Sequence, residues 1–341
     1  MDIKYLLKNN ARTIYLSAKI LPRQKRKTFA LAYLVCRIAD TVADTSLIAP
    51  EKRLEFIKKF PILVEQNNYQ KAQETALNFL SKAGENIYKN EAELLKNIGL
   101  CIKEFNTLKK ADKKITLEVL RAVCKAMIQD LTFFPQENSG LIKALPTQKE
   151  TLDYCDAMGG QPGVFWAKLE FGSKLKKHTL EQALKIGRAL QITNILRDID
   201  ADVKIGRIYL PLSQLTRHNL MPQDLLETQN YLKLYPIMLY WINTALENLL
   251  SAKDFLKQIP RRNFFSRAAV AWPVLWSFDT LYLLALAPHK QGKKINGKIS
   301  KLNVYLTMLL SPLYCFSNTL IDKIIDYKKS RIKRLLGNTL G

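Results

Sequence analysis

Two pairs of aspartates stand out in a chain that carries far more positive than negative charge. Asp40 and Asp44 lie in "LAYLVCRIADTVADT", and Asp198 and Asp202 lie in "ALQITNILRDIDADVKIGRIYLP". Residues four apart lie one turn above each other on the same face of a helix. Two like charges in this arrangement cost roughly 0.2–0.5 kcal/mol. Because the surrounding residues are apolar, each pair predicts a bound cation as its partner.

The residue types beside the acids indicate which cation and which ligand. Mg²⁺ prefers carboxylates, water and phosphate oxygens to a cage made of protein alone. Asn194 lies one turn before Asp198, and Arg37 and Arg197 place planar guanidinium groups where they can contact phosphate oxygens. Asp200 is rotated by about 200° from the acidic stripe and is expected to face solvent. The pairs therefore predict two facing helices that bind Mg²⁺ and a diphosphate. Surface acidic turns paired with lysine or arginine are the alternative.

The pattern along the chain favours an all-α fold. Apolar residues recur with helical period almost throughout, and no hairpin turn separates two alternating runs. We predict one domain over residues 1–341, with its core at about 10–325 and a basic C-terminal tail at 326–341, and with a ligand cavity between facing helices. The predicted helices cover roughly residues 24–45, 50–66, 90–108, 113–133, 148–171, 179–204, 229–257, 263–287 and 301–326.

Charge and composition limit the function classes. The 341 residues include 53 Lys and Arg against 30 Asp and Glu, a net charge of +23. This charge fits nucleic acid, an anionic membrane surface or an anionic substrate. No zinc finger, RNA-binding motif or aromatic-interleaved basic stripe accompanies it, so no nucleic-acid partner is expected. The five cysteines and three histidines are scattered, which argues against a disulfide framework or a histidine-built metal site.

The apolar segments of the chain indicate where in the cell the protein is expected. The N-terminus is interrupted by lysine and arginine before any stretch reaches signal-peptide length, and we expect a cytoplasmic protein, with peripheral membrane association as an option. Two later apolar stretches, from Ala268 and from Val304, contain breaks or are shorter than the roughly 20 residues that span a bilayer. We interpret both as core or interfacial helices.

Four segments, taken in order, resemble the squalene/phytoene synthase family, the head-to-head trans-isoprenyl diphosphate synthases. "ARTIYLSAKILP" is similar to the N-terminal substrate-entry segment, and "YLVCRIADTVADT" to the first aspartate motif. "YCDAMGGQPGVFW" resembles the central tyrosine and glycine segment, and "LQITNILRDIDADVKIGRIYLP" the second aspartate motif. The resemblance implies an isoprenoid-synthase helical bundle with a central apolar cavity. It also implies that two farnesyl (or geranylgeranyl) diphosphates are joined C1 to C1 through a cyclopropyl diphosphate.

The resemblance also implies roles for individual residues. The four aspartates hold Mg²⁺ and the diphosphates. Tyr154 lies beside the reacting carbons, as a proton acceptor relayed to the leaving diphosphate or as a cation stabiliser, with a buried core tyrosine as the alternative. Phe165 and Trp166 are apolar walls for the carbocation or plain core residues. The substrate-binding residues are Arg12, Thr13, Arg37, Gln191, Asn194, Arg197 and Tyr209.

Some segments depart from the family pattern. The first motif reads A-D-T-V-A-D, which looks like the squalene-forming members. Pro162 in "QPG" is expected to kink its helix. The late basic residue near the second diphosphate has no sure counterpart, and Lys293, Lys294 and Lys298 are the candidates.

Our leading interpretation is a squalene-synthase-type farnesyl-diphosphate farnesyltransferase that makes presqualene diphosphate and then squalene. NADPH as the hydride donor rests on the resemblance alone, because no G-x-G-x-x-G follows a strand. The alternatives within the family are dehydrosqualene, phytoene or hydroxysqualene formation without NADPH. Outside it they are a non-catalytic helical assembly factor, or a membrane-surface module that uses the basic tail "KKSRIKRLLG" on anionic lipids. Membrane binding through this tail is compatible with catalysis, so we expect farnesyl diphosphate as the substrate and a membrane surface as a partner.

Overall fold

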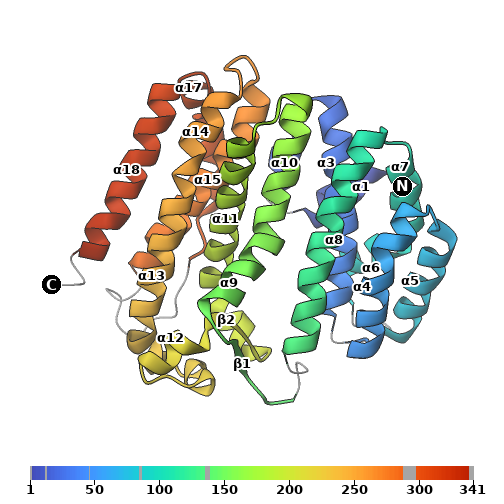
Figure 1. Cartoon of the computed structure of the whole chain (residues 1–341), viewed down its shortest axis with the longest axis horizontal. Helices are drawn as coiled ribbons and strands as arrows, with labels where there is room; N and C mark the ends of the chain where they lie inside the picture. The colour runs from blue at the N-terminus through green and yellow to red at the C-terminus, as the bar shows by residue number, and fades with distance from the viewer. Residues whose placement is uncertain are drawn as a thin grey trace. The chain divides into compact units, whose positions relative to one another are not determined.

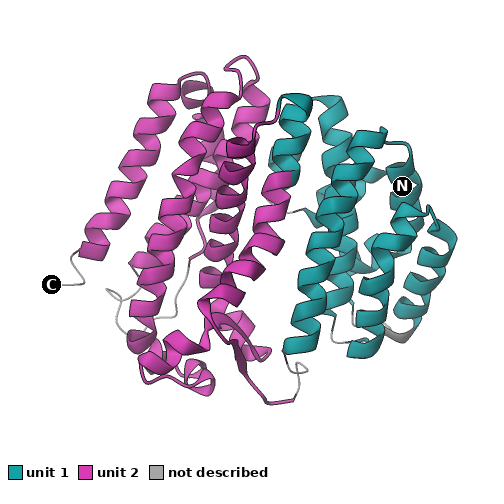
Figure 2. Cartoon of the chain, viewed as in Figure 1, with its two compact units in different colours: residues 1–133, 165–174 teal, residues 134–164, 175–341 magenta. Residues whose placement is uncertain are grey.

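The computed structural model describes residues 2–11, 14–45, 47–83, 87–134, 139–286 and 297–337. Helices make up almost all of the regular structure in these ranges, which confirms the all-α prediction (Figure 1). The chain divides into two compact units, residues 1–133 with 165–174 and residues 134–164 with 175–341 (Figure 2). Because compactness alone does not establish independent folding, the expected single domain stays a prediction.

Unit 1 is built around helix α3. α3 contacts α1, α4, α7 and α8, because Leu31, Leu34 and Ile38 recur at helical spacing and are fully buried. The prediction of a helix over 24–45 is confirmed. The helices of unit 1 are α1 (Ile3–Asn10), α2 (Ile14–Lys19), α3 (Arg23–Asp44), α4 (Pro50–Glu65), α5 (Tyr69–Ala83), α6 (Lys89–Lys96), α7 (Ile98–Asn106) and α8 (Lys110–Phe133).

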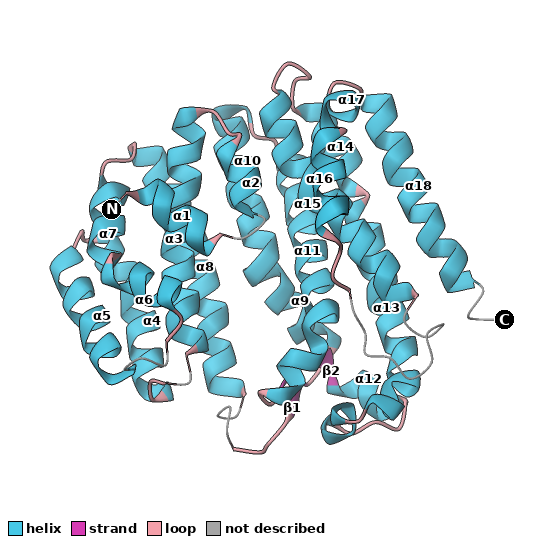
Figure 3. Ribbon diagram, turned by 180° about the vertical axis from the view of Figure 1, so that it is seen from behind, coloured by secondary structure: helices cyan, strands magenta, loops and turns pink. Residues whose placement is uncertain are grey.

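Unit 2 is built around helix α11, which packs against α13, α14 and α15. β1 and β2 form a two-stranded parallel sheet in which Lys143 pairs with Arg207, and Figure 3 shows both strands. The elements of unit 2 are β1 (Lys143–Leu145), α9 (Gln148–Cys155), α11 (Lys177–Lys204), β2 (Arg207–Pro211), α12 (Leu212–Arg217), α13 (Tyr231–Leu249), α14 (Ser251–Gln258), α15 (Phe264–Ala285), α16 (Lys301–Leu309), α17 (Ser311–Cys315) and α18 (Asn318–Gly337).

A π-helical turn, Asp156–Gly160, joins α9 to α10 (Gln161–Phe171). The boundary between the units falls within α10. The predicted kink takes the form of this turn, which ends just before Pro162, where a proline ring is incompatible with a regular α-helix. The turn brings two backbones together, since a Cβ on Gly187 of α11 would lie 2.1 Å from the carbonyl oxygen of Gly159.

One described helix, α15, passes the length and composition test for a membrane span, and 72% of its most apolar window is buried inside the structure. Such burial is typical of a core helix, in agreement with the core interpretation of the segment from Ala268. The segment from Val304 lies in α16, where no residue is buried, and in α17, where Tyr314 and Cys315 are buried and Leu313 is exposed.

Residues 326–337, predicted as part of a basic tail, form the second half of α18. Ile332 and Leu336 are buried, and Lys328 forms an ion pair with Asp279 of α15. This half of α18 is therefore packed onto unit 2.

All five cysteines are free thiols. Burial raises the pKa of Cys101, Cys124 and Cys315 to about 12. These three thiols are therefore protonated and unreactive at neutral pH.

Candidate active site

The first aspartate motif occupies the C-terminal end of α3. Asp40 is half-buried, and Asp44 is exposed and is the last residue of the helix. Arg37, one turn earlier, donates to the Asp40 carboxylate and also, over 3.0 Å, to Glu91 of α6. Burial is the largest single influence and would lower the pKa of Arg37, but the charges of Asp40, Tyr33 and Glu91 and the hydrogen bond to Asp40 together outweigh it, so the net shift is upward. The guanidinium thus stays charged beside the acids.

The position of this motif in its helix adds to its need for a cation. The last turn of α3 contains no basic residue. A carboxylate at a helix C-terminus opposes the helix dipole by about 0.3–1 kcal/mol. Two aspartates four apart in this turn add their mutual repulsion. A bound divalent cation would remove both penalties, as the sequence prediction of a Mg²⁺ site requires.

A buried arginine of unit 1 fixes this end of the helix. Arg53 of α4 is fully buried and donates to the carbonyl oxygen of Ala43 over 2.9 Å. That carbonyl belongs to the last turn, where no further helical residue can donate to it. Arg53 therefore holds in place the turn that carries Asp40 and Asp44.

The second aspartate motif lies near the C-terminal end of α11, in unit 2. Asp198 and Asp202 are half-buried, as are Gln191 and Asn194. Arg197 donates to both carboxylate oxygens of Asp198, one bond measuring 2.9 Å. This hydrogen bonding is the largest cause that raises the pKa of Arg197, and the charge of Asp202 adds to it.

Two predicted site tyrosines of unit 2 lie against each other. The rings of Tyr154 and Tyr209 are stacked with centroids 4.4 Å apart and an interplanar angle of 22°. Tyr209 lies on β2, next to α11, and its carbonyl oxygen accepts a hydrogen bond from Thr151 of α9 over 2.8 Å. Tyr154, Tyr209 and the second motif are therefore positioned by adjoining elements of one unit.

The expectation for Asp200 is wrong. Asp200 is half-buried and accepts a hydrogen bond from the Tyr231 hydroxyl of α13. Burial, followed by the bond to Asp200, raises the pKa of Tyr231. Asp200 does lie off the acidic stripe, but α13 packs against that face and covers part of the side chain.

Phe165 and Trp166 pack in unit 1 against Phe29 of α3. The Phe29 ring lies 6.5 Å from that of Phe165 and 5.8 Å, edge to face, from that of Trp166. Phe165 is buried and Trp166 is half-buried. Both side chains thus take part in core packing, and a contact of either with substrate stays a prediction.

Several predicted residues lie outside the described ranges. These are Arg12 and Thr13 of the N-terminal segment and the basic candidates Lys293 and Lys294. Lys298 is described and is exposed.

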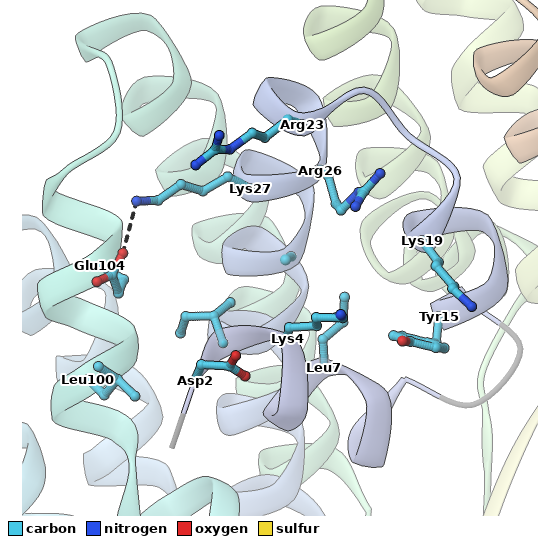
Figure 4. A pocket seen from close by; sticks show the side chains of 12 residues that line it. Asp2, Lys4, Leu7, Tyr15, Lys19, Arg23, Arg26, Lys27, Leu100 and Glu104 are labelled. Atoms are coloured by element: carbon cyan, nitrogen blue, oxygen red, sulfur yellow. Dashed lines mark ion pairs between the residues drawn. The ribbon is translucent and has the colours of Figure 1, made fainter.

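A cavity of about 400 Å³ in unit 1 lies away from the first aspartate motif. Figure 4 shows basic side chains from α1, α2 and the first turns of α3 around it. Glu104 of α7 forms an ion pair with Lys27 across 2.9 Å. The cavity involves the opposite end of α3 from Asp40 and contains none of the predicted site residues. The side chains that line it include Lys4, Tyr15, Lys19, Arg23, Arg26, Lys27, Leu100 and Glu104.

Some partners of the site were not predicted from the sequence. Glu91 shares Arg37 with Asp40, and Arg188 of α11 forms a two-bond pair with Asp156 of the π-helical turn, at 2.6 and 2.7 Å. Asp156 lies two residues after Tyr154, so this pair anchors the turn that follows the tyrosine. Only its position inside the tyrosine and glycine segment could have drawn attention to it.

The donor set fits Mg²⁺. In the described part of the chain no three Asp, Glu, His or Cys side chains come together as a metal site. Each motif offers two carboxylates, and Mg²⁺ is typically held by one or two carboxylates together with water and substrate phosphates. The predictions that all four acids share one metal cluster, and that a central apolar cavity adjoins it, concern both units and stay predictions.

Comparison with known proteins gives consistent matches. Residues 7–295 match the family model of squalene/phytoene synthase. A bifunctional lycopene cyclase/phytoene synthase from Colletotrichum graminicola is 27% identical over 262 residues, 74% of this chain and 41% of that protein. A presqualene diphosphate synthase from Rhodopseudomonas palustris is 26% identical over 251 residues, 73% of this chain and 76% of that protein.

The fold has counterparts among solved structures. A complex of TcSQS with a ligand superposes with a TM-score of 0.74 and 17% identity, covering 98% of each chain. The chain spans less than two thirds of the length of several curated relatives that it matches. The family model, in contrast, covers most of the chain and all four segments singled out in its sequence. The chain therefore belongs to the squalene/phytoene synthase family.

Proposed function

We propose that this chain is a prenyltransferase that joins two farnesyl diphosphates head to head to give presqualene diphosphate and then squalene. The arrangement of unit 2 carries the proposal. There Tyr154 is stacked on Tyr209, and β2, which bears Tyr209, adjoins α11 with its Arg197–Asp198 pair. Family members include squalene, presqualene diphosphate and phytoene synthases, so the product is the part of the proposal that most needs a test.

In this proposal the aspartate pairs hold Mg²⁺ and the diphosphates. Mg²⁺ supplies positive charge that stabilises the departing diphosphate. Arg37 and Arg197 add planar forks that contact the phosphate oxygens as negative charge develops on them. Each arginine already carries an aspartate partner, so it is charged and oriented before substrate arrives.

Tyr154 acts on the prenyl chain. Its ring is held by the stack on Tyr209, and the Tyr209 ring also lies edge to face against Phe134, with centroids 5.2 Å apart. A fixed aromatic face stabilises an allylic cation through its π electrons. In the alternative role, the hydroxyl accepts the proton lost on cyclopropane closure and passes its own proton to the leaving diphosphate. The two roles differ in whether the hydroxyl is needed.

The described residues offer no phosphate-binding loop for NADPH. No glycine-rich turn into a helix follows either described strand. β2, for example, ends at Pro211 and α12 begins at Leu212. NADPH as hydride donor therefore stays a proposal from the family resemblance, and no residue of this chain is assigned to it.

The test is a product assay with purified protein, farnesyl diphosphate and Mg²⁺, with and without NADPH, read by mass spectrometry. We expect presqualene diphosphate without NADPH and squalene with it. Dehydrosqualene in both reactions would assign the carotenoid-type alternative, and hydroxysqualene the water-capturing one. Geranylgeranyl diphosphate in parallel reactions tests phytoene formation. Absence of any coupled product from either substrate would contradict the proposal.

A further inference from the structure

Helix α16 turns its apolar stripe outward. Its large apolar side chains stand at positions i, i+3, i+4 and i+7, the spacing that normally faces a protein core. They are Leu302, Tyr305, Leu306 and Leu309, with exposed fractions of 66%, 62%, 42% and 74%. No residue of α16 is buried. The helix therefore presents to the surroundings the face that a helix of a globular protein normally buries.

The exposed apolar surface continues along the chain into α17 and the start of α18. Leu310, Leu313, Phe316 and Leu320 are all exposed. Phe316 stacks on Phe264 of α15 with centroids 5.3 Å apart. These four side chains and the four of α16 form what we call the α16–α17 patch. Figure 3 shows α16 in front of α15, against which it packs. Large apolar patches of this kind mark surfaces that bind a protein or a membrane.

The patch is held in a fixed geometry. Ser300 caps α16 by accepting from the backbone N–H of Asn303 over 3.1 Å. Tyr314 of α17 donates to the carbonyl oxygen of Thr307 over 2.6 Å. The segment that leads into α16 packs near the second aspartate motif, since a Cβ on Gly297 would lie 3.3 Å from Cγ of Arg197. The patch is therefore a defined surface of unit 2.

The charges around the patch discriminate between occupants. Residues 280–321 contain no aspartate or glutamate. Lys301 and Lys323 are exposed on the patch segment and beside it. A second copy of this chain, with a net charge of +23, would bring the same cations against each other. An anionic lipid surface instead attracts each of them, by on the order of 1 kcal/mol per residue.

The basic residues of α18 are less suited to such a surface. Lys329 and Lys333 lie 3.8 and 3.6 Å from the Glu247 carboxylate. Arg331 lies over the ring of Tyr282 at 4.0 Å. These cations already have partners within unit 2.

We propose that the α16–α17 patch docks onto an anionic lipid bilayer, with its leucines and Phe316 at the boundary between headgroups and acyl chains. Tyr305 suits that depth, because its ring is apolar and its hydroxyl is polar. The exposed lysines contact the anionic headgroups. An apolar stripe flanked by cations is the pattern of helices that lie in the membrane plane. The proposal does not depend on which product the enzyme makes.

The test is sedimentation of the full-length protein with vesicles of phosphatidylcholine containing phosphatidylglycerol, compared with phosphatidylcholine alone. Wild type should bind the anionic vesicles more tightly. The variant Leu309→Ser/Leu313→Ser should lose at least about tenfold in partitioning, because each leucine contributes through burial of its side chain. The matched control is Leu226→Ser/Leu232→Ser, which alters equally exposed leucines of unit 2 outside the patch and should bind as wild type does.

Further arms separate the alternatives. Circular dichroism confirms that each variant is folded, and an environment-sensitive fluorophore on Leu309→Cys should shift to the blue on anionic vesicles, whereas the same label on Leu232→Cys should not. Three results would overturn the proposal. The first is that the wild type does not bind anionic vesicles, and the second is that Lys329→Gln/Lys333→Gln loses vesicle binding while the patch variant keeps it. The third is that the wild type is a dimer in ultracentrifugation and the patch variant is a monomer whose vesicle binding is unchanged.

Discussion

The two aspartate motifs contain the same residue types but hold their arginines differently. On α3, Arg37 lies one turn before Asp40 and is shared with Glu91 of α6. On α11, Arg197 is adjacent to Asp198 and donates to both of its carboxylate oxygens. A two-bond pair fixes a guanidinium plane, whereas a shared guanidinium has to exchange partners when a phosphate arrives. The second motif is therefore more strongly preorganised than the first.

The motifs also differ in how the chain continues beyond them. α3 ends at Asp44. α11 continues past Asp202 and turns at Gly206, whose φ of +81° suits glycine, into the strand that carries Tyr209. Tyr209 in turn supports Tyr154. The second motif is thus structurally connected to the tyrosine pair. The first is anchored by the Arg53 bond to Ala43.

The largest effect is expected from the acids themselves. Asp44→Asn and Asp198→Asn should each lower the rate of diphosphate release by about 10²–10³-fold or more, because a group that stabilises developing charge in the transition state is lost. Thermal stability should hold, since removing one of two like charges relieves repulsion. The measurement is pyrophosphate release from farnesyl diphosphate together with the melting temperature. Full turnover by either variant would show that the two motifs are not equivalent parts of one chemistry.

The tyrosine pair gives the next effect. Tyr154→Phe keeps the ring stacked on Tyr209 but removes the hydroxyl. If the hydroxyl accepts the proton, the rate should fall by about 10²-fold or more. If the ring alone stabilises the cation, the rate should stay close to that of wild type. Tyr209→Phe serves as the matched control, because it keeps the same stack and removes the hydroxyl of a residue that is predicted to bind substrate, so it should raise KM rather than lower kcat.

A third comparison concerns the close packing of α11, which carries the second motif, against the π-helical turn. Gly187→Ala would place a Cβ 2.1 Å from the backbone oxygen of Gly159, and overpacking of this kind costs about 1–3 kcal/mol. The melting temperature should fall, with loss of activity because α11 shifts against the turn that comes after Tyr154. Gly337→Ala, whose Cβ would meet nothing within 4 Å, should leave both unchanged. Equal effects of the two variants would contradict the close packing.

The arginines test the difference in preorganisation directly. Lysine keeps the charge but not the planar fork. Arg197→Lys should raise KM for farnesyl diphosphate by about tenfold, the equivalent of one charge-assisted hydrogen bond. Arg37→Lys should have a smaller effect, because only one nitrogen of Arg37 bonds to Asp40. The measurement is KM from steady-state kinetics. A larger increase in KM for Arg37→Lys than for Arg197→Lys would show that the first motif is the more preorganised.

The features that could be predicted from the sequence are local. Apolar spacing placed α3 and α11 within two residues of their observed ends, because helical periodicity depends only on neighbouring residues. The stacking of Asp40 on Asp44 and of Asp198 on Asp202 follows from the same geometry. Helices α1, α2 and α5 were not predicted, since they are short or rich in polar residues and depend on packing within unit 1.

The features that could not be predicted are tertiary. The face of α11 that bears Asp200 packs against α13. The contact residue, Tyr231, lies some 30 positions further along the chain than Asp200, whereas periodicity depends only on neighbouring residues. The outward stripe of α16 has the same spacing as a buried stripe, so periodicity alone assigns it to the core. The sharing of Arg37 with Glu91 joins two helices that no local pattern connects.

The smallest effect is expected at the hydrogen bond between Tyr231 of α13 and Asp200 of α11. Tyr231→Phe removes the hydrogen bond to Asp200 and should lower the free energy of unfolding by about 0.5–1.5 kcal/mol. Asp200 lies off the stripe that carries Asp198 and Asp202, so kcat should change by less than about twofold. Denaturant unfolding and steady-state kinetics on the same preparation separate the two quantities. If kcat falls with stability intact, the hydrogen bond from α13 to Asp200 also affects the catalytic acids of α11, just as the Arg53 bond to Ala43 is expected to hold the acids of α3.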